Sequence, residues 1–429
     1  MSDVPPVSDV PPQGGGFAGV PRVVPRPGAD LEPLLDWLRG GRPVGERLDF
    51  TAGTALPDGR IDLCKQALGA EGAARVAAAL RDAGRESDAR RGSGAGRESV
   101  AGRGSDVRRE PDAGRDPEEP FAVRHLLLGT DALGDEGAAA VTGARGVETL
   151  YLGCNGITAG GACRIADRLR ASPQAVTGVW LKRNPLGTGG GRAAAQLVDA
   201  ARTLRTLDLV QTGLGAAGLA VLADALLAAA DSGRRVERLF LGGNALGVAG
   251  AAPLAELIAS GAVSELYVSA AQLGDGGALL LAEGLARAPY AALGRLSVAS
   301  NGIGPGAAAR LIQAATAAGV ELLDLGRVRA AQVLGARDNH VDGEAAAAVA
   351  ETLAAGEHRL AHLVLTHTGL RSRGAHRLLD TAERAVTPTR FVLGQGVAAS
   401  IKRRLAAFSA DVPAPAVPAD VAAVRSVHR

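Results

Sequence analysis

Aromatic residues are scarce in this 429-residue chain, which contains two Trp, three Tyr and six Phe. Apolar residues nevertheless make up 47% of the sequence, and 59 positions are Gly. The core must therefore be built from Leu, Val and Ala. Thin repeated layers suit such residues better than one large globule packed around aromatic rings.

The sequence also has no large excess of acidic or basic residues, no paired cysteines and no long apolar run. The 47 basic and 45 acidic residues leave a net charge of +2, so no overall field favours nucleic acid or anionic lipid. Cys64, Cys154 and Cys163 form no CxxC pair, which argues against a disulfide framework or a cysteine-rich zinc site. Without a signal-like segment or an apolar run of about 18 residues, we expect a cytoplasmic protein that does not enter membranes.

One sequence motif recurs along the chain. It consists of two aliphatic residues on either side of one other residue, followed by an Asn, a further aliphatic residue and usually glycines. The second aliphatic residue recurs every 27 to 32 residues, at Leu152, Leu181, Leu209, Leu241, Val268 and Val298. An amide side chain after each strand can satisfy backbone groups where the chain turns away. The sequence offers such structural asparagines at Asn155, Asn184, Asn244 and Asn301.

This motif resembles the leucine-rich repeat of the ribonuclease-inhibitor-like class, and the resemblance covers residues 45–408. It implies an α/β solenoid, or horseshoe, of about 10–11 repeats, with a parallel β-sheet on the concave face and α-helices on the convex face. It also implies that another protein binds along the concave sheet. The excess of Arg over Lys, together with abundant Ala and Gly, looks like the composition of a high-GC bacterial genome.

Breaks in the repeat predict the remaining organisation. Residues 1–28 are predicted to be a disordered Pro/Gly-rich leader, and residues 29–58 an N-terminal cap. Residues 59–408 are predicted to form the repeat domain, interrupted by a disordered charged insertion at 81–120. The Pro-containing segment 409–429 is predicted to be a disordered tail.

The middle residue of each predicted strand faces the concave side, because side chains alternate along a strand. Aromatic residues are enriched at interface hot spots, so those at this position are predicted partner-binding residues: Tyr151, Trp180, Phe240 and Tyr267. Polar residues of both signs surround them: Lys182, Asp208, Arg238 and Glu265. Small neighbours such as Gly153 and Gly242 leave the rings room to stand clear. The alternative is that the rings pack on one another to stabilise the sheet.

One step between repeats, from Leu325 to Leu365, is about 11 residues longer than the others. The sequence favours a strand at 323–325 with a long loop behind it over a strand at 334–336. Loop insertions in a solenoid often carry function, so Arg327 is a further partner-binding candidate, although a tolerated insertion explains it equally well.

No catalytic constellation accompanies these features. The sequence has histidines at 358, 362, 367 and 376, but His362 falls on a predicted strand and His367 in the loop after it, so they do not make a helical metal site. The Gly-rich turns lack the GK[ST] of a phosphate loop. We therefore expect a non-enzymatic scaffold or receptor, a monomer without cofactor or metal, that binds another protein.

Two other functions follow from resemblance alone. Similar repeats occur in Ran GTPase-activating proteins, which suggests a regulator of a nucleotide hydrolase with Arg327 near the partner's phosphate. Ribonuclease-inhibitor-like inhibition is the second, but those inhibitors are cysteine-rich and acidic, unlike this chain.

Overall fold

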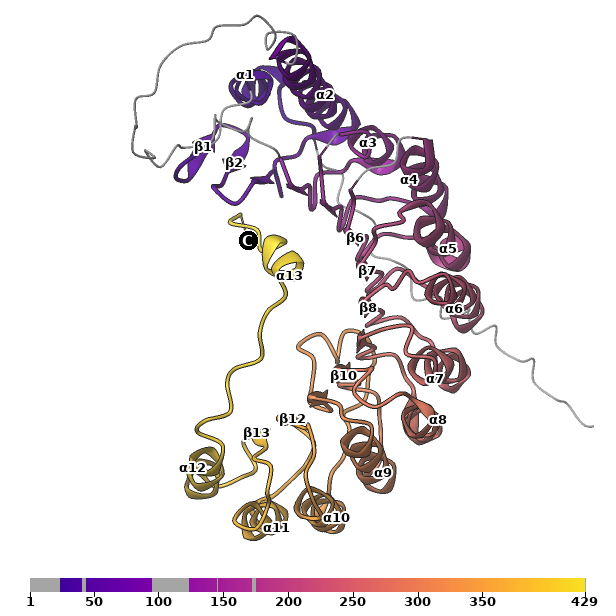
Figure 1. The fold of residues 1–429 in the computed structure, drawn as a ribbon, viewed down its shortest axis with the longest axis vertical. Helices are drawn as coiled ribbons and strands as arrows, with labels where there is room; N and C mark the ends of the chain where they lie inside the picture. Colours follow the sequence, from indigo (N-terminus) through magenta and orange to yellow (C-terminus); the bar gives the residue numbers. More distant parts are fainter. Residues whose placement is uncertain (1–23, 41–43, 95–122, 145, 172–174, 429) are drawn as a thin grey trace, which may run out of the picture.

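The computed structural model describes residues 24–40, 44–94, 123–144, 146–171 and 175–428. These residues form one open sheet of 13 strands, which lie in the order in which they occur along the chain. Helices cover the outer side of the curved sheet and leave its inner side uncovered by helices of the repeats (Figure 1). The predicted α/β solenoid, with a concave parallel sheet and convex helices, is confirmed.

Eleven of the described strands run parallel, each three or four residues long. The register pairs the first aliphatic residue of each repeat with its equivalents, as in Leu150, Val179 and Leu207. The strands are β3 (Arg60–Asp62), β4 (His125–Leu127), β5 (Thr149–Tyr151), β6 (Gly178–Trp180), β7 (Thr206–Asp208), β8 (Arg238–Phe240), β9 (Glu265–Tyr267), β10 (Arg295–Ser297), β11 (Leu322–Asp324), β12 (His362–Leu365) and β13 (Arg390–Leu393).

The convex helices are rich in Ala and Leu, and each packs on the next. Small residues set the closest approach: a Cβ built on Gly191 would lie 2.1 Å from the carbonyl oxygen of Gly218 in the neighbouring helix. The helices are α2 (Gly69–Gly94), α3 (Gly134–Val141), α4 (Ala159–Ala171), α5 (Gly190–Ala200), α6 (Ala216–Asp231), α7 (Ala251–Ala259), α8 (Gly274–Arg287), α9 (Pro305–Ala317), α10 (Gly343–Ala354), α11 (Ser372–Ala382) and α12 (Ala399–Phe408).

An N-terminal unit covers the first repeat. Helix α1 (Glu32–Gly40) buries Leu34, Leu35 and Leu38, and it is followed by the antiparallel strands β1 (Leu48–Phe50) and β2 (Gly53–Ala55). Strand β2 pairs antiparallel with β3, so this unit occupies the edge of the parallel sheet. Without it, that edge would present unpaired backbone groups.

The asparagines form a ladder behind the strands. Asn244 accepts hydrogen bonds from the backbone N–H groups of Thr212 and Leu214, at 3.0 and 3.1 Å. Its amide nitrogen donates to the carbonyl oxygens of Leu209 and Leu241, both at 2.8 Å. Asn155, Asn184 and Asn301 make equivalent bonds across neighbouring repeats. Each amide thus joins two repeats where the ladder of the sheet has ended.

In the long interval between Leu325 and Leu365, the structure places the strand where the sequence favoured it. Strand β11 (Leu322–Asp324) pairs with both neighbouring strands. The asparagine of this repeat is Asn339, which accepts from the backbone of Asn301 and Ile303 and donates to Val298 and Leu325. The extra residues therefore lie between the strand and its asparagine.

Two predictions of disorder differ from the structure. Helix α2 continues to Gly94, into the predicted insertion 81–120, because residues 81–94 contain no Pro and are mostly compatible with a helix. The tail 409–428 is also defined and contains helix α13 (Ala419–Ala423), since the concave sheet supplies contacts that the tail's own sequence does not reveal. The rest of the insertion, 95–122, and residues 1–23 of the predicted leader lie outside the described residues.

Candidate binding surface on the concave sheet

The four predicted aromatic residues form a continuous row, here called the aromatic row: Tyr151, Trp180, Phe240 and Tyr267. The centroids of Tyr151 and Trp180 are 6.5 Å apart, and those of Trp180 and Phe240 are 5.3 Å apart. Phe240 and Tyr267 are stacked at 4.4 Å with an interplanar angle of 5°. The strand register brings these rings together, as the sequence pattern predicted.

The rings do not stand clear of the sheet. Trp180 is 4% exposed and Tyr151 is 8% exposed, while Phe240 and Tyr267 are half-buried. The Nζ of Lys182 lies 5.1 Å from the centroid of the Tyr151 ring, within the range of a cation–π contact. The predicted alternative of mutual packing is therefore present, and it does not exclude binding at the half-buried end of the row.

An aspartate ends three of the strands. In Asp62, Asp208 and Asp324 one carboxylate oxygen accepts a hydrogen bond from the backbone N–H two residues later. Burial raises the pKa of Asp208 to about 6, although its hydrogen bond to the N–H of Val210 opposes the shift. Asp208 sits between Trp180 and Phe240 in the sheet register, so its role here is to shape the strand end.

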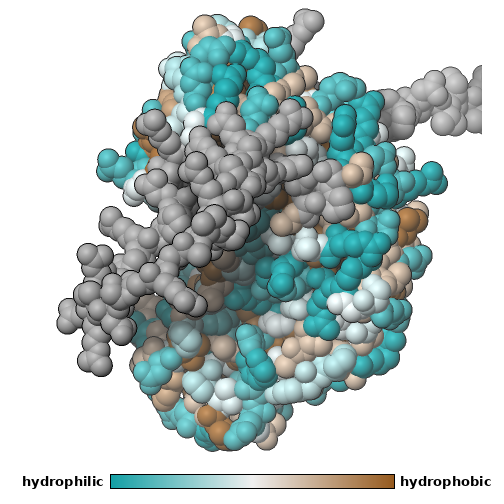
Figure 2. Space-filling view, turned by 45° about the horizontal axis from the view of Figure 1, so that its top comes forward, coloured by the Kyte–Doolittle hydropathy of each residue, from teal (hydrophilic) through white to brown (hydrophobic). Residues whose placement is uncertain are grey.

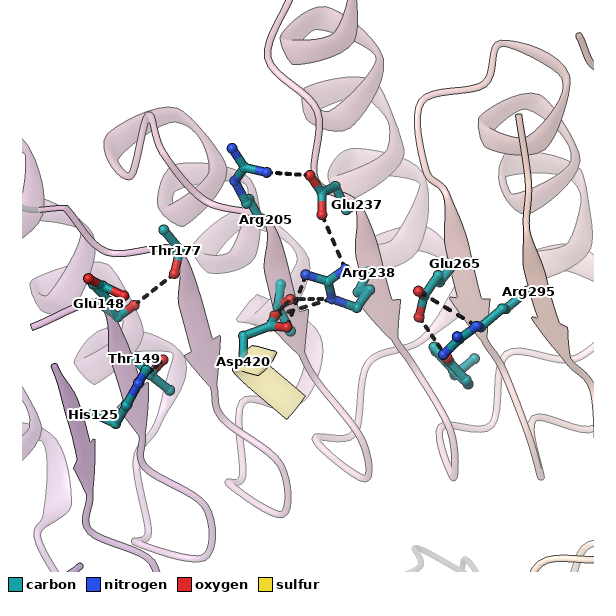
Figure 3. Close-up of polar contacts among 12 residues, drawn as sticks. His125, Glu148, Thr149, Thr177, Arg205, Glu237, Arg238, Glu265, Arg295 and Asp420 are labelled. Carbon is teal, nitrogen blue, oxygen red and sulfur yellow. Dashed lines mark hydrogen bonds and ion pairs between the residues drawn. The ribbon is translucent and has the colours of Figure 1, made fainter. Parts of the chain in front are cut away.

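Charged and hydroxyl side chains occupy the starts of the strands beside the aromatic row (Figure 3). Arg238 contacts Glu237, at 3.1 Å, and Glu237 also accepts from Arg205, at 2.7 Å. Glu265 accepts a hydrogen bond from the Tyr267 hydroxyl at 2.7 Å. Burial, and next the negative charge of Glu265, raise the pKa of that phenol. Charges of both signs thus alternate along this edge, and the side chains of Arg238, Glu265 and Arg295 are largely buried.

The C-terminal tail, residues 409–428, lies on this same surface. It leaves α12, crosses the open side of the solenoid and places α13 against the strands of the N-terminal repeats (Figure 1). Arg390 and Arg295 donate to the carbonyl oxygens of Val412 and Ala416, at 3.4 and 2.7 Å. Further on, the carboxylate of Asp62 accepts from the backbone N–H of Val427 at 2.6 Å. The tail therefore follows the sheet from its C-terminal to its N-terminal end.

Helix α13 and the residue that follows it contribute one carboxylate and two aliphatic side chains. Two guanidinium nitrogens of Arg238 contact the carboxylate of Asp420, at 3.0 and 3.2 Å, and the Thr206 hydroxyl donates a hydrogen bond to it. Val421 and Val424 pack in a small apolar cluster whose other members are Cys64, Leu127, Tyr151, Trp180 and Phe240. Burial in this cluster raises the pKa of the Cys64 thiol to about 12.

Sequence reasoning missed Asp420, Val424 and Thr206 as parts of this surface. One local signal exists: Pro418 precedes a short segment in which Val421 and Val424 are three residues apart and share a helix face. The signal spans only five residues, so it identifies the helix poorly without the surface that receives it.

Arg327 lies in the loop after β11. Its Nε lies 3.3 Å from a carboxylate oxygen of Asp338, and both side chains are partly exposed. The same loop exposes Arg329, Val333 and Arg337. The loop thus carries an ion pair of its own between Arg327 and Asp338, two strands beyond Tyr267 in the sheet.

On the coloured part of the face drawn in Figure 2, hydrophilic and hydrophobic residues are interspersed. Large exposed apolar side chains such as Tyr290, Val333 and Val386 belong to separate loops.

Among the described residues, no group of three or more His, Cys, Asp or Glu is arranged to hold a metal ion. None of the described helices combines the length and apolar character needed to span a bilayer.

Fold and site together define an α/β repeat solenoid whose concave sheet carries an aromatic row and a docked C-terminal tail. Comparison with protein-family models and with curated proteins finds no match for this chain.

Proposed function

We propose that this protein is a non-enzymatic, cytoplasmic leucine-rich-repeat scaffold or receptor that binds a partner protein on its concave face. The observation that carries the proposal is the aromatic row, which ends in two half-buried stacked rings beside charges of both signs. Large rings supply apolar contact area at a low cost in conformational entropy, and neighbouring charges give orientation. Four adjoining rings on the concave face suit this role.

Phe240 gives the sharpest test, because Trp180 and Tyr151 are buried and their removal would also disturb the fold. We expect Phe240→Ala to reduce recovery of a specific partner at least about 10-fold in affinity capture from the native organism, as expected for a hot-spot ring. Tyr290→Ala is the matched control, since this ring is 64% exposed in a loop between α8 and β10.

Both variants must retain the circular dichroism spectrum of the wild type before capture is compared. A partner recovered equally by wild type and Phe240→Ala would contradict binding on the aromatic row. Loss of the partner in Tyr290→Ala as well would place the interface elsewhere.

A further inference from the structure

Resting on the proposed function, we infer that the partner docks through a short segment carrying a carboxylate followed by aliphatic residues, and that the C-terminal tail occupies that site until it is displaced. In the tail, the pattern is Asp420, with Val421 one residue later and Val424 four residues later. These three side chains make the contacts of α13 and its C-terminal neighbour with the sheet described above.

The carboxylate is required by Arg238. This guanidinium is only 12% exposed, and Asp420, at 13%, is the group that faces it from the tail. Glu237 contacts another of its nitrogens, but that carboxylate also serves Arg205. A partly buried charge that loses its partner is strongly disfavoured. A ligand that displaces the tail must therefore bring an anionic group to Arg238 and Thr206.

The aliphatic residues are required by the apolar cluster. Val424 lies among Cys64, Leu127, Tyr151 and Trp180, all of which are buried with the tail in place. Removing the tail without replacement would expose this apolar surface to water, which is unfavourable in proportion to its area. The surface therefore favours an aliphatic occupant next to the carboxylate.

The tail leaves part of this surface unfilled and some of its polar groups unpaired, so a partner segment could make more contacts than the tail does. Within the described part of the chain, the buried donors Trp180 Nε1 and Arg60 Nε have no hydrogen-bond acceptor. A cavity of about 520 Å³ also remains beside α13, lined by charged residues such as Arg124, Glu148 and Arg205. Helix α13 has only five residues, too few for stability on its own. A partner that supplies an acceptor and fills the cavity has the means to displace the tail.

The docked tail belongs to its own chain rather than to a second copy. It is continuous with α12 through residues 409–418, and along this path Arg390 and Arg295 of the same chain bind its carbonyl oxygens. Being tethered, the tail acts at an effective concentration of about millimolar, so a free ligand of similar chemistry must compete with it.

The test uses full-length protein and a fluorescent peptide with the sequence of residues 411–428. In the tail-release variant Asp420→Arg/Val424→Asp the peptide is expected to bind saturably. Wild type should bind it at least about 10-fold more weakly, because its own tail occupies the site. A peptide carrying Asp420→Asn, and a tail-release protein carrying Arg238→Ala, should each lose binding at least about 10-fold.

Cysteine labelling supplies an independent readout with an internal control. Cys64 is buried beneath the tail, whereas Cys163 lies on the convex helix α4. Tail release should raise the alkylation rate of Cys64 at least about 10-fold and leave that of Cys163 unchanged. Mass spectrometry of the two labelled peptides measures both rates in one sample.

Three outcomes would overturn the inference: equal peptide binding by wild type and the tail-release variant, no binding by a folded tail-release variant, or a wild-type dimer that tail release dissociates. Once a Phe240-dependent partner is captured, the 411–428 peptide should displace it from the tail-release variant. A partner that stays bound refutes the shared docking chemistry but leaves the proposed function intact. If the peptide binds as expected and capture yields no Phe240-dependent partner, the proposed function fails instead.

Discussion

Replacing Asn184 by Ala is expected to lower the free energy of unfolding by about 3 to 5 kcal/mol. The side chain accepts from the backbone N–H groups of Asn155 and Ile157, at 2.9 and 3.1 Å, and donates to the carbonyl oxygens of Leu152 and Leu181, both at 2.9 Å. All four groups are buried, and each one left without a partner costs about 1 kcal/mol or more. Urea titration followed by circular dichroism measures the loss.

Two further variants distinguish the loss of the ladder's hydrogen bonds from the effect on stability of any substitution. Gln313→Ala removes a hydrogen bond with Arg310 on the exposed side of α9 and should change stability by less than about 0.5 kcal/mol. Asn184→Asp keeps the acceptor oxygen but removes the amide donors. The decrease in the free energy of unfolding that it causes should therefore grow as pH rises and the carboxyl ionises. A loss below about 1 kcal/mol for Asn184→Ala would show that water replaces the ladder.

The repeated part of the fold was predictable because its signal is periodic. Leu150, Val179 and Leu207 recur at the same place in each repeat, and equivalent residues in stacked repeats must meet in register. The same periodicity placed Tyr151 and Trp180 side by side. Even the strand at Leu322–Asp324 followed from its spacing to the preceding marker, although the position of its asparagine, Asn339, shifted with the inserted loop.

The tail was not predictable because its order depends on residues far away in the sequence. Asp420 meets Thr206 and Arg238, more than 180 residues earlier, and Val427 meets Asp62 across 365 residues. Such pairs have no period, and the tail's Pro and Ala content is typical of disordered segments. Its path is set by the aromatic row and by the strand-start charges, so it could be placed only after the sheet was known.

A second departure from the repeat concerns Asp131, which occupies the place of an asparagine. Its Oδ1 accepts from the backbone N–H of Gln66 at 2.7 Å, as Asn155 accepts from Asp131 itself at 2.9 Å. An asparagine here would direct its amide toward the carbonyl oxygens of Leu63 and Leu128, by analogy with Asn184. The second oxygen of Asp131 is buried and has no partner among the described residues. A carboxylate is therefore a poor occupant of this position.

Burial raises the pKa of Asp131 to about 8, despite backbone hydrogen bonds that lower it. In the unfolded chain the same group titrates near its ordinary value of about 3.9. Between these two values the native state binds one proton more than the unfolded state, so the free energy of unfolding falls as pH rises from about 4 to about 8. Above pH 8 this contribution no longer changes.

Asp131→Asn removes this titration and restores the missing amide donors, so the variant should be more stable than wild type at pH 8. With 1.36 kcal/mol for each unit of pKa difference, the gain should be at least about 2 and at most about 5 kcal/mol. Near pH 4, where wild-type Asp131 is protonated in the folded state and about half protonated in the unfolded state, the two proteins should differ by less than about 1 kcal/mol. Urea titrations at both pH values measure this, with the exposed Asp36→Asn as the matched control. If the gain over wild type does not grow between pH 4 and pH 8, Asp131 is not the buried acid that its position in the ladder implies.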